Sequence, residues 1–313
     1  MKLVSFVIPC YRSEKTIRLV VDEIRQTMDG NEALDYEIIL INDCSPDATF
    51  KVISELANED KHIVAVDLVR NFGQHAALMA GYRLCKGDYI VSLDDDGQSP
   101  ANEVMGLIEK IEEGYDVVYA SYNHKQHSAF RNWGSHVNDA MTRVMLGKPK
   151  EIQITSYFVT TRTIINEVVR YEGCYPYVIG LVLRTTKKIC NVPVHHRRRE
   201  SGRSGYTLGK LFALWMNGFT SFSVKPLRLS IYCGVLSAVL GFLYLIYIIV
   251  GAFLNSSTPM GWRSLMVVML MLGGIILIVL GIVGEYVGRI YMCVNSAPQY
   301  VIRKVFQNED VLE

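Results

Sequence analysis

The sequence lacks several features that would assign it at once to a class. Its seven cysteines are scattered singly without a CxxC pair, so we expect reduced, structural thiols in a cytoplasmic domain. Neither GxxxxGK[ST] nor GxGxxG occurs in the early segments, which disfavours a P-loop or a dinucleotide fingerprint. A formal net charge of +1 gives no overall basic field and argues against a nucleic-acid binder. The opening MKLVSFVIPC reads as a strand rather than a signal peptide.

Charge is also missing from two long stretches towards the C-terminus. No charged residue occurs in 229–254 or in 265–284, and each run reaches the roughly 20 residues that cross a bilayer as a helix. The loop between them, NSSTPMGW, is short and uncharged. The flanks carry six basic residues: Lys210, Lys225, Arg228, Arg289, Arg303 and Lys304. This positive-inside pattern predicts a transmembrane hairpin with both chain ends in the cytoplasm.

The hairpin divides the chain into four predicted segments. They are a cytoplasmic α/β domain (1–205), a juxtamembrane amphipathic helix (206–226), two transmembrane helices (227–288) and a cytoplasmic tail (289–313). At the end of the second span, Glu285 and Arg289 are four residues apart and predict a helix-end ion pair. Glycines at 273, 274, 281, 284 and 288 permit close helix packing, either within the hairpin or between subunits, and we expect a homo-oligomer.

The first half of the chain alternates strand-like and helix-like segments. Strands are expected at 3–9, 36–43, 62–69, 88–94 and 116–121, with helices over 13–28, from about 46, over 74–84 and over 102–112. Short β-branched strands that alternate with helices indicate an α/β fold with a mainly parallel sheet covered on both faces. Ligands bind such sheets at the carboxyl ends of the strands, where IPCYRS, INDCSPD, VRNFGQH and LDDDGQ all fall.

Three consecutive aspartates, Asp94, Asp95 and Asp96, follow the fourth predicted strand. Like carboxylates this close repel each other, and burial raises the cost unless a cation or a proton neutralises them. One interpretation is a solvated acidic turn in which Ser99 caps the next helix. The shared edge of the sheet favours another, a metal site. Asp94 and Asp96, with Gln98 as a neutral third ligand, are the hard oxygen donors that suit Mg²⁺ or Mn²⁺ holding a diphosphate.

Basic residues gather just before the predicted amphipathic helix, in HHRRRESGRSGY. Positive-inside anchoring explains such a run without any binding function. The alternative is a guanidinium cluster that grips phosphate groups at the membrane face.

Taken together, these motifs resemble the inverting family-2 glycosyltransferases, specifically the membrane-anchored branch that includes dolichyl-phosphate mannose synthase and bactoprenol glucosyltransferase. The resemblance covers nearly the whole chain and rests on VIPCY, INDCSPD, RNFGQHAALMAGY, GDYIVSLDDDGQSP, EGYDVVYA, VPVHHRRRESGRSGY and GIVGEYVGRIY. It implies a GT-A (Rossmann-like) catalytic domain followed by a two-helix transmembrane hairpin. It also implies an integral protein of the bacterial cytoplasmic membrane with its catalytic domain in the cytoplasm.

The resemblance implies a nucleotide-sugar donor, Mg²⁺ or Mn²⁺, and a polyprenyl phosphate acceptor such as undecaprenyl phosphate. We expect the donor to be UDP-glucose or another UDP-hexose. Positions matching the family's donor pocket are Pro9, Tyr11, Asp43, Asp94 and Asp95. Those matching its acceptor and phosphate contacts are Arg131, Ser135, Arg199, Ser204 and Tyr206. The catalytic set carried over comprises Asp94, Asp96, Arg131 and Arg199.

Two departures from the family pattern affect the expected chemistry. The first loop reads PCYRSE instead of PxYNE, so its acidic residue is displaced to Glu14 or lost. Gln153 stands near the place of a carboxylate sometimes proposed as the base. A phosphate monoester, with a second pKa of about 6, is mostly ionised at neutral pH. An anionic acceptor therefore needs no general base.

Two other functions compete with this interpretation. A processive polysaccharide synthase needs a translocation channel, and the QxxRW motif and further spans of such enzymes are absent from this sequence. A non-catalytic lipid-sugar transport component would have only two spans as its path, and would have no use for the acidic cluster.

Overall fold

The computed structural model describes most of the chain. The described residues are 1–31, 33–122, 143, 148–149, 151–195, 197, 261–295 and 297–308, with scattered positions between 232 and 246. They belong to two compact units, one formed by 1–213 with 298–313 and the other by 214–297. Each unit is described by itself.

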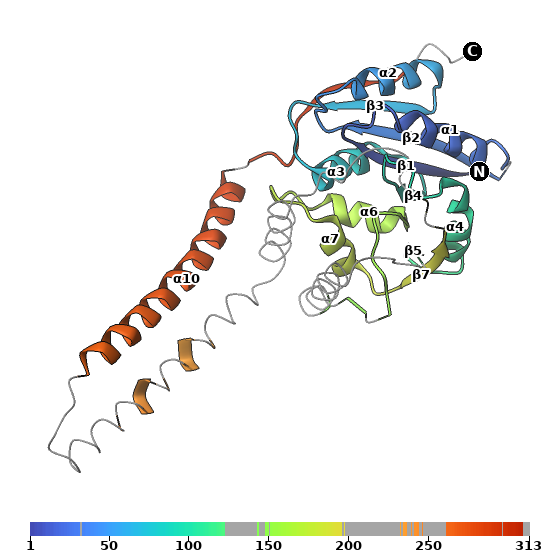
Figure 1. The fold of residues 1–313 in the computed structure, drawn as a ribbon. Coiled ribbons are helices and arrows are strands. Elements are labelled where there is room, and N and C mark those ends of the chain that lie inside the picture. The colour runs from blue at the N-terminus through green and yellow to red at the C-terminus, as the bar shows by residue number, and fades with distance from the viewer. Residues whose placement is uncertain are drawn as a thin grey trace. The chain divides into compact units, whose positions relative to one another are not determined.

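The α/β unit is built on one mixed sheet, in which eight described strands lie in the order β7-β5-β6-β4-β1-β2-β3-β8. The central strands are parallel, because β1 pairs with both β2 and β4, and β2 pairs with β3. These four strands span Lys2–Cys10 (β1), Leu34–Asn42 (β2), Ile63–Leu68 (β3) and Tyr89–Ser92 (β4). The predicted parallel core is confirmed, and each strand alternates with a helix in the chain (Figure 1).

Strands from later in the chain complete the sheet at both sides. They span Val117–Tyr122 (β5), Phe158–Thr161 (β6), Ile189–Val194 (β7) and Ile302–Phe306 (β8). β6 is antiparallel to both β4 and β5, β7 is parallel to β5, and β8 is antiparallel to β3. The sequence did not predict β8, which lies in the segment expected to be a plain cytoplasmic tail.

Helices cover both faces of the sheet (Figure 1). One face carries α1 (Ile17–Met28), α2 (Thr49–Glu59) and α4 (Val104–Glu112), which follows the 3₁₀ turn η1 (Ala101–Glu103). The other carries α3 (Gln74–Leu84), α6 (Arg162–Val169) and α7 (Val178–Thr185), which contact one another. The sheet is therefore covered on both sides, as predicted.

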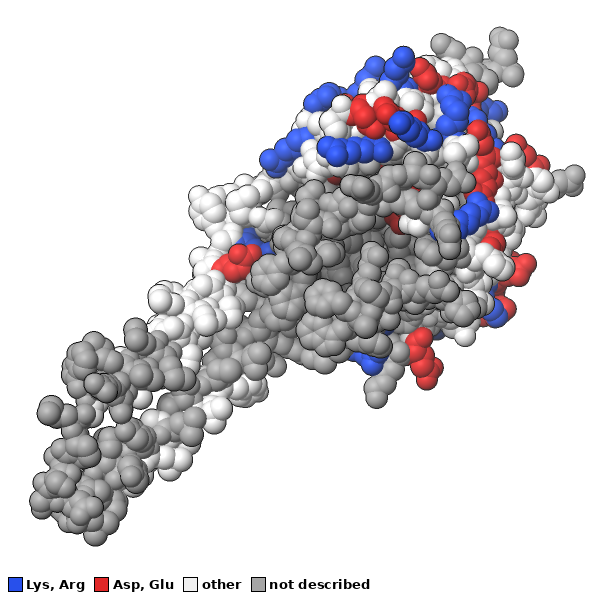
Figure 2. Space-filling view, viewed as in Figure 1, with Lys and Arg blue, Asp and Glu red and all other residues white. Residues whose placement is uncertain are grey.

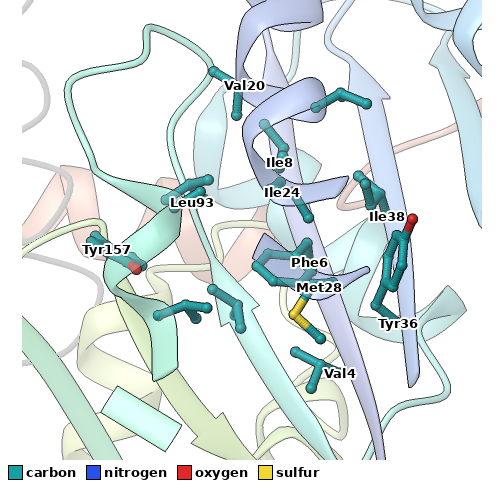
Figure 3. Packing of buried hydrophobic residues seen from close by; sticks show 14 of the residues in the cluster. Val4, Phe6, Ile8, Val20, Ile24, Met28, Tyr36, Ile38, Leu93 and Tyr157 are labelled. Atoms are coloured by element: carbon teal, nitrogen blue, oxygen red, sulfur yellow. The ribbon is translucent and has the colours of Figure 1, made fainter. Parts of the chain in front are cut away.

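Alternate side chains of β1 explain why this strand is apolar throughout. Phe6 and Ile8 are fully buried and point towards Ile24 of α1 (Figure 3). Side chains on the other face meet α3, which packs closely because Gly81 carries no side chain. A Cβ at Gly81 would clash with Cγ1 of Val7 in β1. A strand enclosed on both faces reads as a continuous hydrophobic run.

The helix α1 begins later than predicted. Ser13 to Thr16 form a turn in which the Thr16 N–H donates to the Ser13 carbonyl (3.1 Å), and the regular helix starts at Ile17. This leaves Ser13 at the edge of the sheet, where its hydroxyl takes part in the site described below.

The second unit contains the helix α10 (Trp262–Val294). Within it, Leu272–Val294 has a mean hydropathy of 1.8 and none of it is buried, so by length and composition it is able to cross a membrane. The Arg289 Nε donates to Glu285 Oε1 at 2.9 Å, which confirms the predicted helix-end ion pair. The first predicted span falls mostly outside the described residues.

Candidate active site

The carboxyl ends of the four central strands bring their loops to one edge of the sheet. In the register, Cys10 lies beside Asn42, Asn42 beside Asp67, and Ser92 beside Val7. The loops that follow these strands are therefore neighbours, as the sequence predicted.

Positive φ angles are concentrated in these loops, which hold four of the five found among the described residues. Arg12 and Cys44 adopt positive φ angles of 60° and 51°, and Gly73 and Gly97 adopt 90° and 71°. Each of the four follows a different strand, from β1 to β4 in order. A side-chain-bearing residue in the left-handed region costs about 1–2 kcal/mol relative to the right-handed one. Such strain is typical of functional sites, where the surrounding structure holds it in place.

Asp94 is held from two sides by side chains outside its own loop. The Gln74 Nε2, at the start of α3, donates to Asp94 Oδ1 at 3.0 Å, and the Ser156 hydroxyl donates to Asp94 Oδ2. Burial raises the pKa of Asp94 to about 6; the Ser156 hydrogen bond opposes this shift, and the charges of Asp96 and Asp95 add to it. A freely solvated acidic turn is therefore not what the structure contains.

Ser156 reaches this edge because of the direction of β6. Phe158, the first residue of β6, lies opposite Ser92, the last residue of β4, since the two strands are antiparallel. The segment before β6 thus arrives beside the loop after β4. The sequence analysis did not single out Ser156 or Gln74. Nothing in the local pattern of TSYFVTTR shows which way that strand runs.

Asp95 fixes the loop that follows β1. Its Oδ2 accepts the Tyr11 backbone N–H at 2.9 Å and the Ser13 hydroxyl, and burial raises its pKa. The Tyr11 side chain remains 46% exposed, with the guanidinium carbon of Arg12 5.5 Å from its ring centroid. The carboxylate of Asp95 therefore positions the loop, and the aromatic ring stays accessible.

Asp43 has a similar role one strand further along. Its two carboxylate oxygens accept the backbone N–H groups of Phe72 (2.7 Å) and Gly73 (2.9 Å). The residue is only 3% exposed, and burial raises its pKa. Asp43 thus shapes the loop after β3. Direct contact with a nucleotide, expected for Asp43 and for the buried Pro9 of β1, stays a prediction.

The main chain of Gln98 contacts the beginning of the arginine-rich segment. Its backbone N–H donates to Asp96 Oδ1 at 3.1 Å, and its carbonyl accepts the Arg197 N–H at 3.2 Å. Arg197 is anchored in turn by Glu23, whose Oε2 lies 2.7 Å from the Arg197 Nη1. This segment follows β7 and so begins at the same edge. The predicted acceptor residues lie outside the described residues: Arg131, Ser135, Arg199, Ser204 and Tyr206.

The predicted metal ligands are oxygen atoms of the kind that bind a hard divalent cation. In the part of the chain that the structure describes, no group of three or more His, Cys, Asp or Glu side chains is arranged to hold a metal. The predicted ligands are instead two carboxylates and an amide oxygen, from Asp94, Asp96 and Gln98. The effect of Asp96 on the pKa of Asp94 shows concentrated negative charge, which a cation would neutralise.

Both departures from the family pattern have a structural counterpart. The Glu14 Oε2 accepts the Ala48 N–H at 3.1 Å, so this side chain binds the start of α2. The Gln153 main chain is fixed to β7, because its N–H donates to Asn191 Oδ1 (2.8 Å) and its carbonyl accepts the Asn191 amide (2.7 Å). The Ser99 hydroxyl, considered above as a helix cap, instead lies 3.1 Å from the Tyr122 hydroxyl.

Comparison with known proteins defines the class. Glycosyl transferase family 2 matches residues 5–169, and the GtrB C-terminal hairpin matches residues 225–290. The chain belongs to glycosyl transferase family 2 and is a glycosyltransferase. The hairpin match, together with the apolar α10, confirms the predicted membrane hairpin, which follows the catalytic domain in the sequence.

Relatives match almost the whole length of the chain. An uncharacterized glycosyltransferase, YkcC of Bacillus subtilis (strain 168), is 33% identical over 310 residues, which cover 98% of this chain and 95% of the relative. The undecaprenyl-phosphate 4-deoxy-4-formamido-L-arabinose transferase of Enterobacter sp. (strain 638) is 35% identical over 313 residues, with the same coverage.

Among solved structures, the fold resembles glucosyl-3-phosphoglycerate synthase from Mycobacterium tuberculosis, in complex with Mn²⁺ and UDP-glucose. The TM-score is 0.53 at 20% identity, over 69% of this chain and 76% of that one. This likeness confirms the GT-A fold.

Proposed function

We propose that this glycosyltransferase moves a sugar from a nucleotide-sugar to undecaprenyl phosphate in one inverting displacement, giving a lipid-linked monosaccharide for cell-envelope glycosylation. The observation that carries the proposal is the cluster Asp94–Asp96 at the carboxyl edge of the sheet, in a chain with a membrane hairpin. The names of relatives that are about as long as this chain support the acceptor.

The proposed donor is a UDP-hexose, with UDP-glucose as the first candidate. Support comes from the M. tuberculosis enzyme, whose structure holds UDP-glucose and Mn²⁺. In this chain Asp94, Asp96 and Gln98 would hold Mg²⁺ or Mn²⁺. The bound ion supplies positive charge for the diphosphate leaving group.

The described side chains position the loops that receive the donor. Gln74 and Ser156 orient the Asp94 carboxylate, so that its direction is set before any ligand arrives. Asp95 and Asp43 hold the loops after β1 and β3 through backbone N–H groups. Such preorganisation lowers the reorganisation needed during the reaction.

For the acceptor, we propose that the phosphate is bound by arginine, serine and tyrosine side chains of the two segments that follow β5 and β7. The residues concerned are Arg131, Ser135, Arg199, Ser204 and Tyr206. The acceptor oxygen is already anionic at neutral pH and attacks without a general base. Gln153, in place of a family carboxylate, agrees with this mechanism.

The hairpin is proposed to lie in the bacterial cytoplasmic membrane, with the α/β unit in the cytoplasm and the protein assembled as a homo-oligomer. The basic residues on both flanks support this orientation, because positive residues are retained on the cytoplasmic side. The same orientation places the active site on the side where nucleotide-sugars are made.

The test uses the purified full chain in lipid nanodiscs that contain undecaprenyl phosphate. It is offered UDP-glucose, UDP-N-acetylglucosamine, UDP-galactose and nucleotide-activated 4-deoxy-4-formamido-L-arabinose, each with Mn²⁺, Mg²⁺ or EDTA. We expect a lipid product heavier by one sugar, formed only with metal. A polymeric product would point to a processive synthase, and no product with any donor would contradict the proposal.

A further inference from the structure

The strand β8 contains two neighbouring basic residues that look equivalent in the sequence but have different surroundings. The Arg303 Nη1 lies 3.2 Å from Asp67 Oδ2, and its Nη2 donates to the Val69 carbonyl at 2.9 Å. The neighbouring Lys304 is exposed, with its ammonium 5.5 Å from the ring centroid of Phe306. Positive-inside anchoring treats the two residues alike, but of the two only Arg303 is paired with a carboxylate among the described residues.

A β-bulge accounts for the direction of the Arg303 side chain. Asp67 lies opposite Lys304 and the next residue, Leu68, lies opposite Ile302, so Arg303 is an extra residue between the two pairs. Bulges occur beside active sites, where they redirect a side chain. The bulge stands next to the end of β3, which borders the candidate site.

Asp67 is a buried carboxylate with partners on both sides. Its side chain is 7% exposed, and the Asn42 Nδ2 donates to Asp67 Oδ1 at 2.7 Å. The Asn42 Oδ1 accepts the Ser45 N–H at 3.1 Å, and the Ser45 hydroxyl accepts the Arg12 N–H at 3.1 Å. A continuous chain of hydrogen bonds therefore crosses the carboxyl ends of β3, β2 and β1.

This chain of hydrogen bonds supports the loops assigned to the donor. Asn42 directly precedes Asp43, which holds the loop after β3, and Arg12 directly follows Tyr11, which is bound by Asp95. A buried charge that loses its partner is strongly destabilising, and the surrounding groups rearrange to relieve it. Removing the guanidinium of Arg303 is therefore expected to disturb Asn42 and the two loops beside it.

We propose that β8 is part of the scaffold of the donor site and that Arg303 is a positioning residue for nucleotide binding. Its guanidinium fixes Asp67, and Asp67 sets the Asn42 amide from which the loops after β2 and β1 are held. The inference rests on the proposed function, which places the nucleotide in these loops. It gives a role in donor binding to a strand that follows the membrane unit in the chain.

The test compares Arg303→Met with Lys304→Met, in the full chain in nanodiscs. Each variant is titrated calorimetrically with UDP and, in parallel, with GDP, in the presence of Mn²⁺. We expect the Kd of the bound nucleotide to rise about 10-fold or more in Arg303→Met, as when a hydrogen-bonding partner of a metal ligand is removed. Lys304→Met should bind as wild type does.

Two further readouts separate positioning from general stability. In Arg303→Met the donor KM should rise, while kcat and the acceptor KM stay within about twofold. Amide exchange should accelerate in 11–16 and 42–49, which the chain of hydrogen bonds holds, and in 69–75, but not in α4. Arg303→Lys, which keeps the charge but loses the forked geometry, should give an intermediate Kd and serves if the methionine variant does not fold.

A double-mutant cycle with Asp67→Asn tests the pair itself. Once the carboxylate is gone, Arg303→Met should add little further loss of nucleotide affinity. An unchanged Kd in Arg303→Met or Arg303→Lys, or an equal loss in Lys304→Met, would overturn this inference alone. A wild-type protein that binds neither UDP nor GDP would contradict the proposed function and remove the basis of both.

Discussion

The two units of the molecule use similar apolar side chains in opposite ways. In the α/β unit, Phe6 and Ile39 are fully buried, whereas Ile276, Leu277 and Ile278 of α10 are 63–70% exposed. Figure 2 shows blue and red side chains intermingled over the α/β unit, while the described surface of α10 is mostly white. Single exposed apolar residues are normal in water, but a whole exposed helix requires an apolar surrounding. Burial within the unit, rather than apolar content, distinguishes a core from a membrane span.

The largest expected effect separates chemistry in the α/β unit from membrane attachment. Asp96→Asn removes the negative charge of a proposed metal ligand, so the transfer rate should fall by about 10²–10³-fold, as when one preorganised electrostatic contact is lost. The amount of protein retained in carbonate-washed membranes should not change. Asp35→Asn is the matched control, because Asp35 is exposed at the amino end of β2, away from the site. A near-normal rate for Asp96→Asn in the presence of EDTA would show that the metal assignment is wrong.

The next effect concerns the core itself. Phe6→Ala should lower the free energy of unfolding of the α/β unit by about 3–5 kcal/mol, because the cavity lies between β1 and α1. Leu277→Ala in α10 should leave that free energy unchanged. Hydrogen exchange of the β1 and β2 amides measures both variants. Equal destabilisation by the two substitutions would contradict the separation into two units.

A charge placed on each surface tests the difference in solvent. Ile278→Arg puts a guanidinium in the middle of the predicted span, at a cost of about 2.5–3.5 kcal/mol for insertion. Leu19→Arg changes a residue of α1 that is 57% exposed and should alter stability by about 0.5 kcal/mol at most. The measurement is the membrane-retained fraction of each variant. Full retention of Ile278→Arg, matching Leu19→Arg, would argue against a span at this position.

The smallest expected effect is a change of metal affinity with pH. Asp94 titrates in this range, whereas the apolar surface of α10 has no group that does. The pKa of Asp94 is raised to about 6, so the protonated form prevails below that value and competes with a metal ion. Mn²⁺ affinity should therefore fall about fivefold between pH 6 and pH 5 and level off above about pH 7. Electron paramagnetic resonance titration without nucleotide measures it, with Asp35→Asn as the control. Constant affinity from pH 5 to pH 7 would exclude Asp94 as a ligand.

Local patterns were enough to predict the central fold. The strands β1 to β5 were placed to within a few residues, because each is a short β-branched run followed by a turn. The acidic loop was assigned to the correct edge of the sheet, because parallel strands bring their carboxyl ends together. Asp94 and Asp95 were therefore identified as candidate site residues from spacing and family resemblance.

Contacts between distant segments were not predictable in this way. Ser156 reaches Asp94 only because β6 runs antiparallel, and strand direction leaves no trace in the composition of the strand. In β8, IRKVF is short and charged, so its sequence resembles a tail, and its partner β3 is more than two hundred residues earlier. The motif predicted a nucleotide contact for Asp43, which stays a prediction, and did not predict its hydrogen bonds with the amides of Phe72 and Gly73.

The position of β8 also sets the order in which the protein is completed during synthesis. β3 leaves the ribosome early, whereas the strand that pairs with it follows α10 and is made last of all the described strands. At about 5–20 residues per second, the interval lasts on the order of ten to fifty seconds. Throughout that time the outer edge of β3 presents unpaired N–H and C=O groups, which in other proteins recruit foreign strands. The sheet of the nascent catalytic unit thus stays incomplete at this edge until the membrane helices have been translated.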